Sequence, residues 1–331
     1  MRVQVFFAFV AQVAAYTDID VDMFMYKNID PIVFPGQYNK SHLHTFFGSD
    51  AITINTTTSA ELQAGCATAE NPNDFSTYWV PTLLYTTDDG DSYDPVPVGR
   101  FTAYYNLGDS PAEVAIPQDL MMKAGSASAQ TSDEMDENAQ IQWFCEDDDA
   151  PADKDAAAFP TSTCSTYLQT LVYFPNCVNE DTLNTTYTSS SYGTDNWCPS
   201  DMKVMPQLRF SIRYDVNSVL PDGWSGDAPL ILSSGTSFSS HGDFINGWLP
   251  EAATNMIATT DEKYTFAGVS GPNGDDGAGS VCTTTATDAD PDHGTSNYAE
   301  SVAAMEASDS TTKRQVGQNS GRFHSRRTTS K

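Results

Sequence analysis

The chain has 331 residues, and its 44 acidic residues against 16 lysines and arginines give a formal net charge of -28 at neutral pH. This balance argues against nucleic-acid binding, which needs basic patches that displace counterions from phosphates. Beyond the N-terminus, no segment approaches the ~20 apolar residues of a membrane helix. We therefore expect no nucleic-acid partner and no membrane span, and we expect a monomer.

The N-terminus has the layout of a secretory signal. Arg2 precedes an apolar run over residues 3–10, and small residues lead to a cleavage point after Ala15. Such a segment is too short to span a bilayer, and its alternative is an apolar first strand of the fold. We predict a signal peptide over residues 1–15, a mature chain that begins near Tyr16, and a secreted, extracellular protein.

The next feature is a pair of prolines, Pro31 and Pro35, which make residues 30–37 an extended arm that cannot be helical. Residues 51–54 have strand character. Residues 77–85 are β-branched and aromatic, which predicts a buried strand that is bent or at an edge at Pro81. A strand follows over residues 100–105, and residues 118–125 could form one short helix.

The second half of the chain carries the clearest alternation of apolar and polar residues. We predict strands over residues 141–145, 168–175, 207–215 and 230–232. The best alternation places Leu208, Phe210, Ile212 and Tyr214 on one face. From residue 283 on, large apolar residues are few, so we expect residues 285–331 to be a disordered tail with one weak helix at 299–307.

Cysteine use agrees with export. The six cysteines are even in number and form neither a CxxC nor a Cys/His zinc pattern, which favours disulfides. The pairs that we predict are Cys145–Cys164, Cys177–Cys198 and Cys66–Cys282. Three glycosylation sequons, at Asn39, Asn55 and Asn184, agree with a secreted glycoprotein.

Many short strands with turns between them, few segments of helical period and no internal repeat indicate an antiparallel β-sandwich. We expect a mainly β, jelly-roll-like fold with long disulfide-closed loops. Residues 16–284 form one predicted domain, which is long enough for a single large core.

Two histidine motifs carry the groups best suited to chemistry at neutral pH. His42 and His44 are spaced i, i+2, which places both imidazoles on one face of an extended strand. His241 could complete a three-histidine metal site, with Asp243 as a fourth ligand or as an orienting partner. This reading predicts a divalent metal, zinc or copper.

Calcium is the weaker metal prediction. Two carboxylate clusters, at residues 88–94 and 146–149, lie in turn-like settings. Neither has the ligand spacing of a complete EF-hand loop.

Two further readings of the histidine motifs stay open. In the first, Asp30, Asp50 and Asp243 act with the histidines as metal-free acid–base catalysts on a glycosidic bond. Tyr78, Trp79 and Trp248 would then stack on sugar faces, with Asn246 beside them as a ligand-binding residue. In the second, the histidines only hydrogen-bond the backbone and the tryptophans are core residues.

Several motifs occur in one order along the chain: DPIVFPGQ and SHLHTFFG near the start, Phe174-Pro175-x-Cys177 and Cys198-Pro199 later, and HGDFINGW from His241. This set resembles the secreted DUF1996 family, best known from fungi, over about residues 28–282. The resemblance implies export and a single disulfide-bearing domain with no established activity. Where the family has His-Phe-Pro, this chain has Tyr173-Phe174-Pro175; if that position contributes to a family site, part of the site is altered here.

The residues and the resemblance together predict a secreted protein that acts on or binds extracellular polysaccharide or cell-wall material through its His/Asp cluster. The alternative is a non-catalytic structural or wall-associated binding protein whose histidine motifs are structural. The two differ in whether the chain is an enzyme, and the sequence leaves both open.

Overall fold

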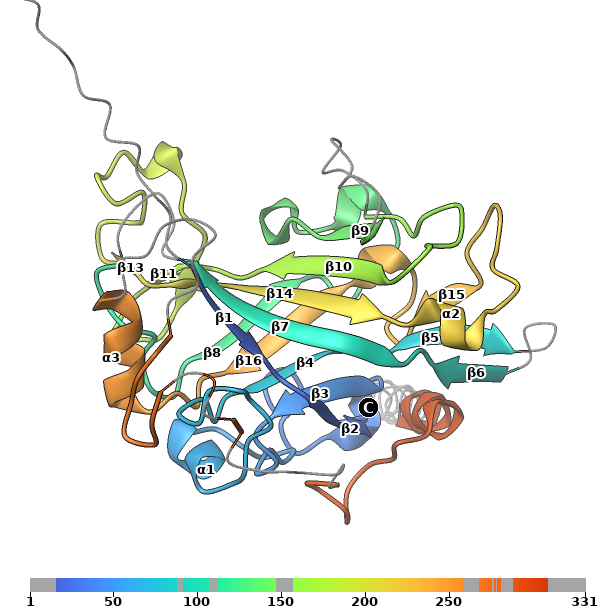
Figure 1. The fold of residues 1–331 in the computed structure, drawn as a ribbon, viewed down its shortest axis with the longest axis horizontal. Helices are drawn as coiled ribbons and strands as arrows, with labels where there is room; N and C mark the ends of the chain where they lie inside the picture. Colours follow the sequence, from blue (N-terminus) through green and yellow to red (C-terminus); the bar gives the residue numbers. More distant parts are fainter. Residues whose placement is uncertain are drawn as a thin grey trace, which may run out of the picture.

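The computed structural model describes residues 16–87, 92–106, 112–146, 157–258, 268–275, 277, 279–280 and 288–308. Within these residues the fold is mainly β, with two five-stranded antiparallel sheets and two three-stranded ones (Figure 1). The predicted signal peptide and residues 309–331 lie outside the described residues, as does most of both acidic clusters considered for calcium.

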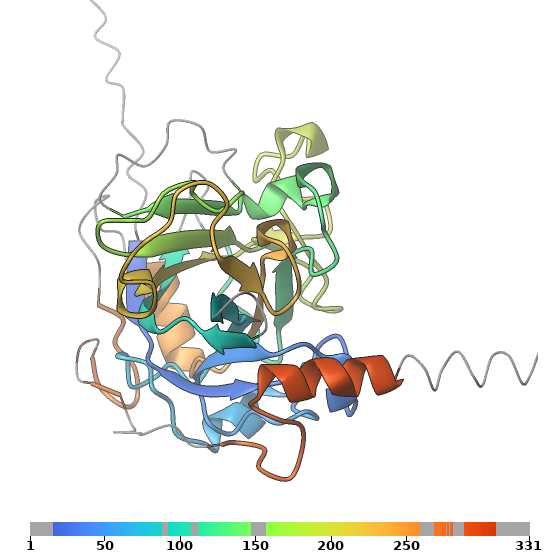
Figure 2. The same cartoon turned by 90° about the vertical axis from the view of Figure 1, so that its right-hand side faces the viewer.

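The first large sheet contains, in spatial order, β1 (Tyr16–Asp20), β7 (Val98–Asn106), β14 (Gln207–Tyr214), β10 (Leu168–Tyr173) and β9 (Gln142–Cys145). The second contains β2 (Met23–Lys27), β3 (His44–Gly48), β4 (Thr77–Pro81), β16 (His241–Ile245) and β8 (Met121–Gly125). These two sheets are the layers of the sandwich (Figure 2).

The smaller elements lie mostly around the ends of this sandwich. One small sheet contains β15 (Leu230–Leu232), β5 (Leu83–Thr87) and β6 (Ser92–Pro95), and the other contains β12 (Thr185–Thr186), β11 (Cys177–Val178) and β13 (Lys203–Val204). The α-helices are α1 (Ser59–Gln63), α2 (Val216–Val219) and α3 (Pro250–Ala258). Short 3₁₀ turns are η1 (Tyr38–Lys40), η3 (Ser132–Glu134), η4 (Glu137–Ala139), η5 (Ser190–Tyr192) and η6 (Ser237–Ser239).

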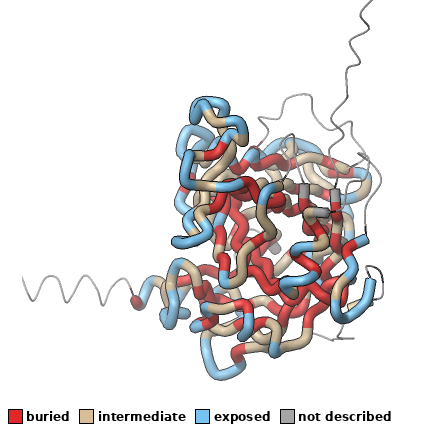
Figure 3. Tube along the Cα trace, turned by 90° about the vertical axis from the view of Figure 1, so that its left-hand side faces the viewer, coloured by how far each residue is buried: buried red, intermediate tan, exposed pale blue. Residues whose placement is uncertain are grey.

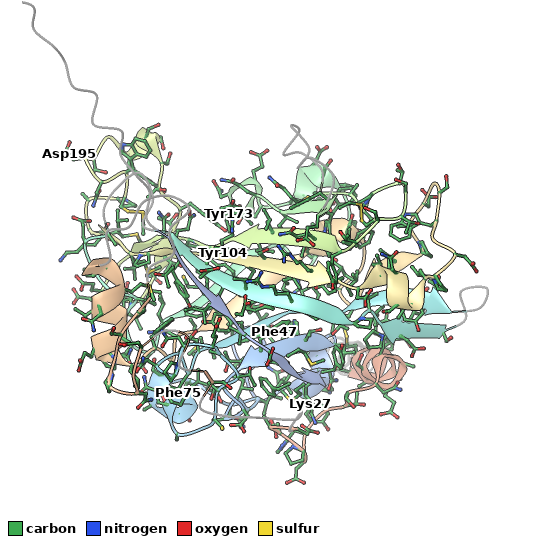
Figure 4. All side chains as sticks on the ribbon, in the orientation of Figure 1. Lys27, Phe47, Phe75, Tyr104, Tyr173 and Asp195 are labelled. Atoms are coloured by element: carbon green, nitrogen blue, oxygen red, sulfur yellow. A yellow bond between two sulfur atoms is a disulfide. The ribbon has the colours of Figure 1, made fainter. Side chains whose placement is uncertain are left out.

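Aromatic side chains fill the space between the two large sheets. Phe47 of β3 stacks on Phe101 of β7 with ring centroids 4.1 Å apart, and Tyr78 of β4 meets Phe210 of β14 edge-on at 5.8 Å. Buried residues follow the sheets, while exposed residues gather in the outer loops (Figure 3). Phe47 lies within this crowded layer of side chains (Figure 4). The predicted β-sandwich is therefore confirmed.

Gly242 lets β16 approach the opposite sheet closely. A Cβ atom there would lie 2.8 Å from the Phe210 ring and 2.9 Å from the Phe174 ring. Any side chain would force these packed rings apart. The glycine of the HGDF motif thus has a packing role: it lets the strand that carries His241 and Asp243 lie directly against the opposite sheet.

The strongest strand predictions are confirmed by β7, β9, β10, β14 and β15. The β14 residues Leu208, Phe210, Ile212 and Tyr214 are all buried, as their alternation requires. The predicted strand at 77–85 is in fact two strands in different sheets. It breaks at the boundary of β4 and β5, directly after Pro81, where a proline cannot donate a ladder hydrogen bond.

Two local predictions were wrong. The helix considered at 118–125 is mostly strand β8, in which Met122 and Ala124 point into the core and Lys123 points outward. Pairing with β16 along its whole length outweighs the weak helix propensity. Residues 51–54 are not a strand either; Ile52 and Ile54 are buried from a turn instead.

Two predicted disulfides are confirmed. Cys145 bonds Cys164 and Cys177 bonds Cys198, with Cα atoms 5.1 and 5.6 Å apart. Cys66 is also disulfide-bonded, and no described cysteine is free. Its predicted partner, Cys282, lies outside the described residues, so that pair stays a prediction.

The prediction set the start of the disordered tail too early in the chain. Residues 288–308 lie against the body beside β2 and β3, and residues 298–308 form the weak helix that the sequence allowed (Figure 1; Figure 2). Lys27 Nζ contacts Asp288 Oδ2 at 2.8 Å, and Asp290 accepts a hydrogen bond from the Ile54 N–H at 3.0 Å. Short polar side chains dock this segment, which is why its lack of large apolar residues misled the prediction. Among the described helices, none is long and apolar enough to cross a membrane.

Candidate metal centre

The sheet order brings the two histidine motifs to one place. β3 and β16 run on either side of β4, with His44 opposite Pro81 and Asp243 opposite Trp79. Both strands begin with a histidine, His44 in β3 and His241 in β16. Because antiparallel neighbours of one central strand share a direction, these two first residues reach the same end of the sheet.

The three histidines form one buried cluster. His42 Nε2 lies 3.2 Å from His241 Nε2, and the His42 and His44 ring centroids are 4.2 Å apart. One ligand nitrogen from each ring lies within 4.8 Å of the other two, so the three could hold a metal ion. Two nitrogens bound to one tetrahedral zinc at about 2.0–2.1 Å would be roughly 3.4 Å apart, which is close to the observed spacing.

Two backbone carbonyls fix the tautomers of the cluster. His44 Nδ1 lies 3.0 Å from the Ile29 carbonyl oxygen, and His241 Nδ1 lies 2.8 Å from that of Ser239. A carbonyl oxygen can only accept, so each Nδ1 carries the proton and donates it. Each Nε2 therefore keeps its lone pair. This outer hydrogen bond is the usual partner of a histidine that binds metal through its other nitrogen.

Burial keeps the imidazoles neutral. It lowers the pKa of His42 and His44 well below the ordinary 6.5, and neighbouring histidines lower both further. Burial also lowers the pKa of His241 to about 4. His44 Nε2 is a buried atom without a hydrogen-bond partner among the described residues. Neutral rings with free lone pairs are the protonation state that a metal requires.

Asp243 adds a carboxylate beside the histidines. Its Oδ2 atom lies 3.8 Å from His241 Nε2 and has no hydrogen-bond partner among the described residues. Burial raises the pKa of this carboxyl well above its ordinary value, nearby Asp30 raises it further, and Lys123 opposes both. An unpartnered buried carboxylate is costly unless a cation lies beside it. A bound metal would provide that cation.

Asp30 lies at the pocket but is partly engaged in its own turn. Its Oδ1 atom accepts hydrogen bonds from the Ile32 and Val33 backbone N–H groups at 3.0 and 2.8 Å. Burial raises the pKa of Asp30, and these two hydrogen bonds oppose the shift. Asp30 therefore shapes the arm and leaves its other oxygen for the pocket.

A pocket of about 420 Å³ opens above the cluster. His42, His241, Asp243 and Asp30 line it, which unites four of the five predicted catalytic residues. His44, fully buried, completes the cluster behind them. A volume in this range suits a small-molecule site.

The pocket also contains residues that sequence reasoning missed. They are the lysines Lys40 and Lys123, the serines Ser126, Ser128, Ser233 and Ser234, and Met305 of the C-terminal helix. Lys40 could have been noticed, because it lies two residues before His42. The others come from β8, from the chain between β15 and β16, and from beyond residue 288, and only the tertiary structure gathers them.

The predicted ligand-binding aromatics lie elsewhere. Tyr78, Trp79, Trp248 and Asn246 are all fully buried. Trp248 Nε1 donates to the Tyr105 hydroxyl at 2.9 Å, and Asn246 Nδ2 donates to the Pro117 carbonyl at 2.8 Å. A sugar-stacking platform formed by these residues was a wrong prediction, because an enclosed ring offers no face to a ligand. The reading of these tryptophans as core residues is the correct one.

Comparison with known proteins supports the resemblance seen in the sequence. Residues 30–248 match the domain of unknown function DUF1996, and this span covers most of the chain and holds all three histidines. No curated protein and no solved structure matches the chain. On the strength of that match, the chain belongs to the DUF1996 family.

Proposed function

We propose that the protein binds one zinc-class divalent metal through His42, His44 and His241 and uses it for catalysis. The observation that carries this proposal is the pair of Nδ1–H donors fixed on Ile29 and Ser239. They leave Nε2 of His44 and of His241 unprotonated in a cluster whose ligand nitrogens all lie within 4.8 Å of one another. A three-histidine zinc site keeps an open coordination position, as catalytic zinc sites do, and supplies a Lewis acid there.

The chain's own residues suit such a site. Asp243 is placed to take up a proton beside the cluster, since burial raises its pKa well above the ordinary value. Three imidazoles favour zinc or copper, whereas calcium prefers a shell of oxygen ligands. Calcium is therefore the weaker alternative.

We further propose that the protein is secreted and acts on extracellular polysaccharide or cell-wall polymer. Two disulfides support an oxidising compartment. The pocket is lined by four serine hydroxyl groups and two carboxyl groups. These groups can hydrogen-bond a ligand that is rich in hydroxyl groups. The signal peptide at residues 1–15 and the three sequons belong to the same proposal.

The metal proposal is tested by elemental analysis of the secreted protein, purified without tags or chelators, using inductively coupled plasma mass spectrometry. We expect about one zinc or copper per chain, and loss of that metal in a folded His42→Ala/His44→Ala variant. His293→Ala is the matched control, because His293 is half exposed and pairs with Asp290 away from the cluster. A wild-type protein that neither contains metal nor takes it up would contradict the proposal.

One observation favours the non-catalytic alternative. The 3.2 Å contact between His42 Nε2 and His241 Nε2 is also the length of an imidazole–imidazole hydrogen bond. A structural cluster of this kind would need no metal. It predicts that His42→Ala lowers the free energy of unfolding equally with and without chelator, and that any polymer binding survives the substitution.

A further inference from the structure

The charges at the pocket are unusual for this chain. Basic residues are scarce, 16 against 44 acids, yet two lysines from separate segments line the same pocket. Lys40 ends η1, and Lys123 lies in the middle of β8. In a chain with so few basic residues, chance placement does not account for two lysines at one concave site.

Lys123 is directed to the cluster by strand pairing. It is the cross-strand partner of Asp243, and directly opposed residues of an antiparallel pair project on the same face. Its side chain is exposed, and it forms no hydrogen bond or ion pair with any described residue. Its charge nonetheless acts on Asp30, Asp243 and His241. The ammonium group is thus close to the site and available.

The chain turns sharply after Lys123. Gly125 has φ +87°, and a Cβ atom there would lie 2.5 Å from the Ser240 carbonyl oxygen. Only glycine adopts this conformation in so little space. The turn ends β8 opposite His241 and directs Ser126 and Ser128 along the pocket wall.

The pocket's charges balance only without a metal. The two lysines match the two carboxyl groups that line the same pocket, Asp30 and Asp243. A divalent ion on the histidines therefore leaves the pocket positive within a protein of formal charge -28. Such a pocket selects anions by electrostatic complementarity.

We propose that the ligand of this pocket is an acidic saccharide, with its carboxylate held between Lys123 and Lys40 and its hydroxyl groups on the pocket serines. This inference rests on the proposed polysaccharide substrate class, and it narrows that class to uronate-containing chains. The carboxylate supplies the negative charge that the metal-bound pocket lacks, and the serine hydroxyls pair with those of the sugar ring.

The test is isothermal titration calorimetry with metal-loaded full-length protein. The probes are trimers of galacturonate, glucuronate and mannuronate, each compared with its fully methyl-esterified form, which has the same shape without the charge. We expect at least one acid trimer to bind about tenfold or more tightly than its ester. Lys123→Gln and Lys40→Gln should each abolish most of this tenfold preference for the acid trimer over its ester. Lys203→Gln is the matched control, because Lys203 is exposed on β13 and pairs with Glu180.

The outcomes separate this inference from the metal proposal. Equal binding of acid and ester, no binding of any trimer, or unchanged selectivity in both pocket-lysine variants overturns the acidic saccharide. Binding of inorganic phosphate that depends on Lys123, without binding of any uronate, also overturns it. Metal content is measured on every sample. Wild-type protein without metal that still prefers the acids through Lys123 supports the inference while the metal proposal fails.

Discussion

Two carbonyl oxygens, at Ile29 and Ser239, decide what the buried histidines can do. Each accepts the Nδ1 proton of one imidazole, so Nε2 of that ring is unprotonated and carries a lone pair. A histidine that only satisfied its own hydrogen bonds would leave no such atom, yet His44 Nε2 has no partner among the described residues. His44 therefore has a buried lone pair that the proposed metal ion would occupy.

Asp243→Asn should have opposite effects on stability and on metal binding. The substitution removes a buried carboxyl whose Oδ2 atom has no described hydrogen-bond partner, so the metal-free protein should become more stable, increasingly so at higher pH. It also removes the negative charge beside His241, so metal affinity should fall about 10–100-fold. Urea unfolding of chelator-treated protein and competitive zinc titration measure the two effects. A less stable metal-free variant at pH 8 would count against this reading.

The histidines should make the metal-free fold sensitive to acid. Their pKa values are lower in the folded chain than the ordinary 6.5, reaching about 4 at His241, so the unfolded chain binds more protons between these pH values. Stability is then fully present above pH 6.5 and is lost as the pH falls toward 4. The slope is roughly 1.4 kcal/mol per pH unit for each such histidine.

Comparison with His241→Gln isolates this contribution in urea unfolding at pH 7, 6 and 5. Asp30 and Asp243 have raised pKa values and contribute the opposite slope, but they are present in both proteins. We expect the variant to have the shallower pH dependence. An unchanged slope in His241→Gln would refute the assignment.

The C-terminal segment is held to the body by an ion pair whose two side chains differ strongly in exposure. The Lys27 side chain in β2 is only 3% exposed, whereas its partner Asp288 is 47% exposed. The segment also accepts the Asn28 N–H at the Thr295 carbonyl, 3.1 Å away, and its Met305 lines the pocket. Docking of this segment thus neutralises a buried lysine and completes one wall of the site.

Asp288→Ala should destabilise the protein by about 1–3 kcal/mol, because it leaves a buried ammonium group without its partner. Glu180→Ala is the matched control. It breaks the pair with Lys203, in which both side chains are about half exposed, and such surface pairs contribute roughly 0–1 kcal/mol. Thermal and urea unfolding of both variants measure the difference. Equal, small effects would show that Lys27 finds another partner.

In the whole molecule, the folded sandwich begins earlier in the chain than the family match does. Residues 30–248 match the family, yet β1 and β2 before this span form an edge of each large sheet. The Ile29 carbonyl, just outside the match, sets the His44 tautomer. The site therefore depends on residues beyond the family match.

The third disulfide is a prediction at this scale. Cys66 is disulfide-bonded, and the four other described cysteines pair with one another. Non-reducing proteolysis with mass spectrometry should therefore recover the Cys66 peptide linked to that of Cys282. A loop of this length should contribute roughly 4–5 kcal/mol in the chain-entropy view. A Cys66 peptide linked to another chain would contradict the pairing.

Local sequence patterns were enough to predict the strands of strongest alternation, the sandwich class, two disulfides and the three histidines of the cluster. These follow from local rules: a half-buried strand must alternate, and three imidazoles in two motifs restrict the candidate sites. β14 and the cluster of His42, His44 and His241 were predicted from such patterns.

Which side chains reach the pocket depends on how the strands pair and on what covers each sheet. Trp79 and Trp248 have the chemistry of a sugar platform, but burial depends on which sheet covers a face, and that is set by long-range pairing. Lys123 joins the site because β8 pairs with β16 rather than forming a helix. The C-terminal segment docks through polar contacts that leave no hydrophobic pattern in the sequence. Each of these outcomes rests on contacts between residues far apart in the chain, which local propensity does not encode.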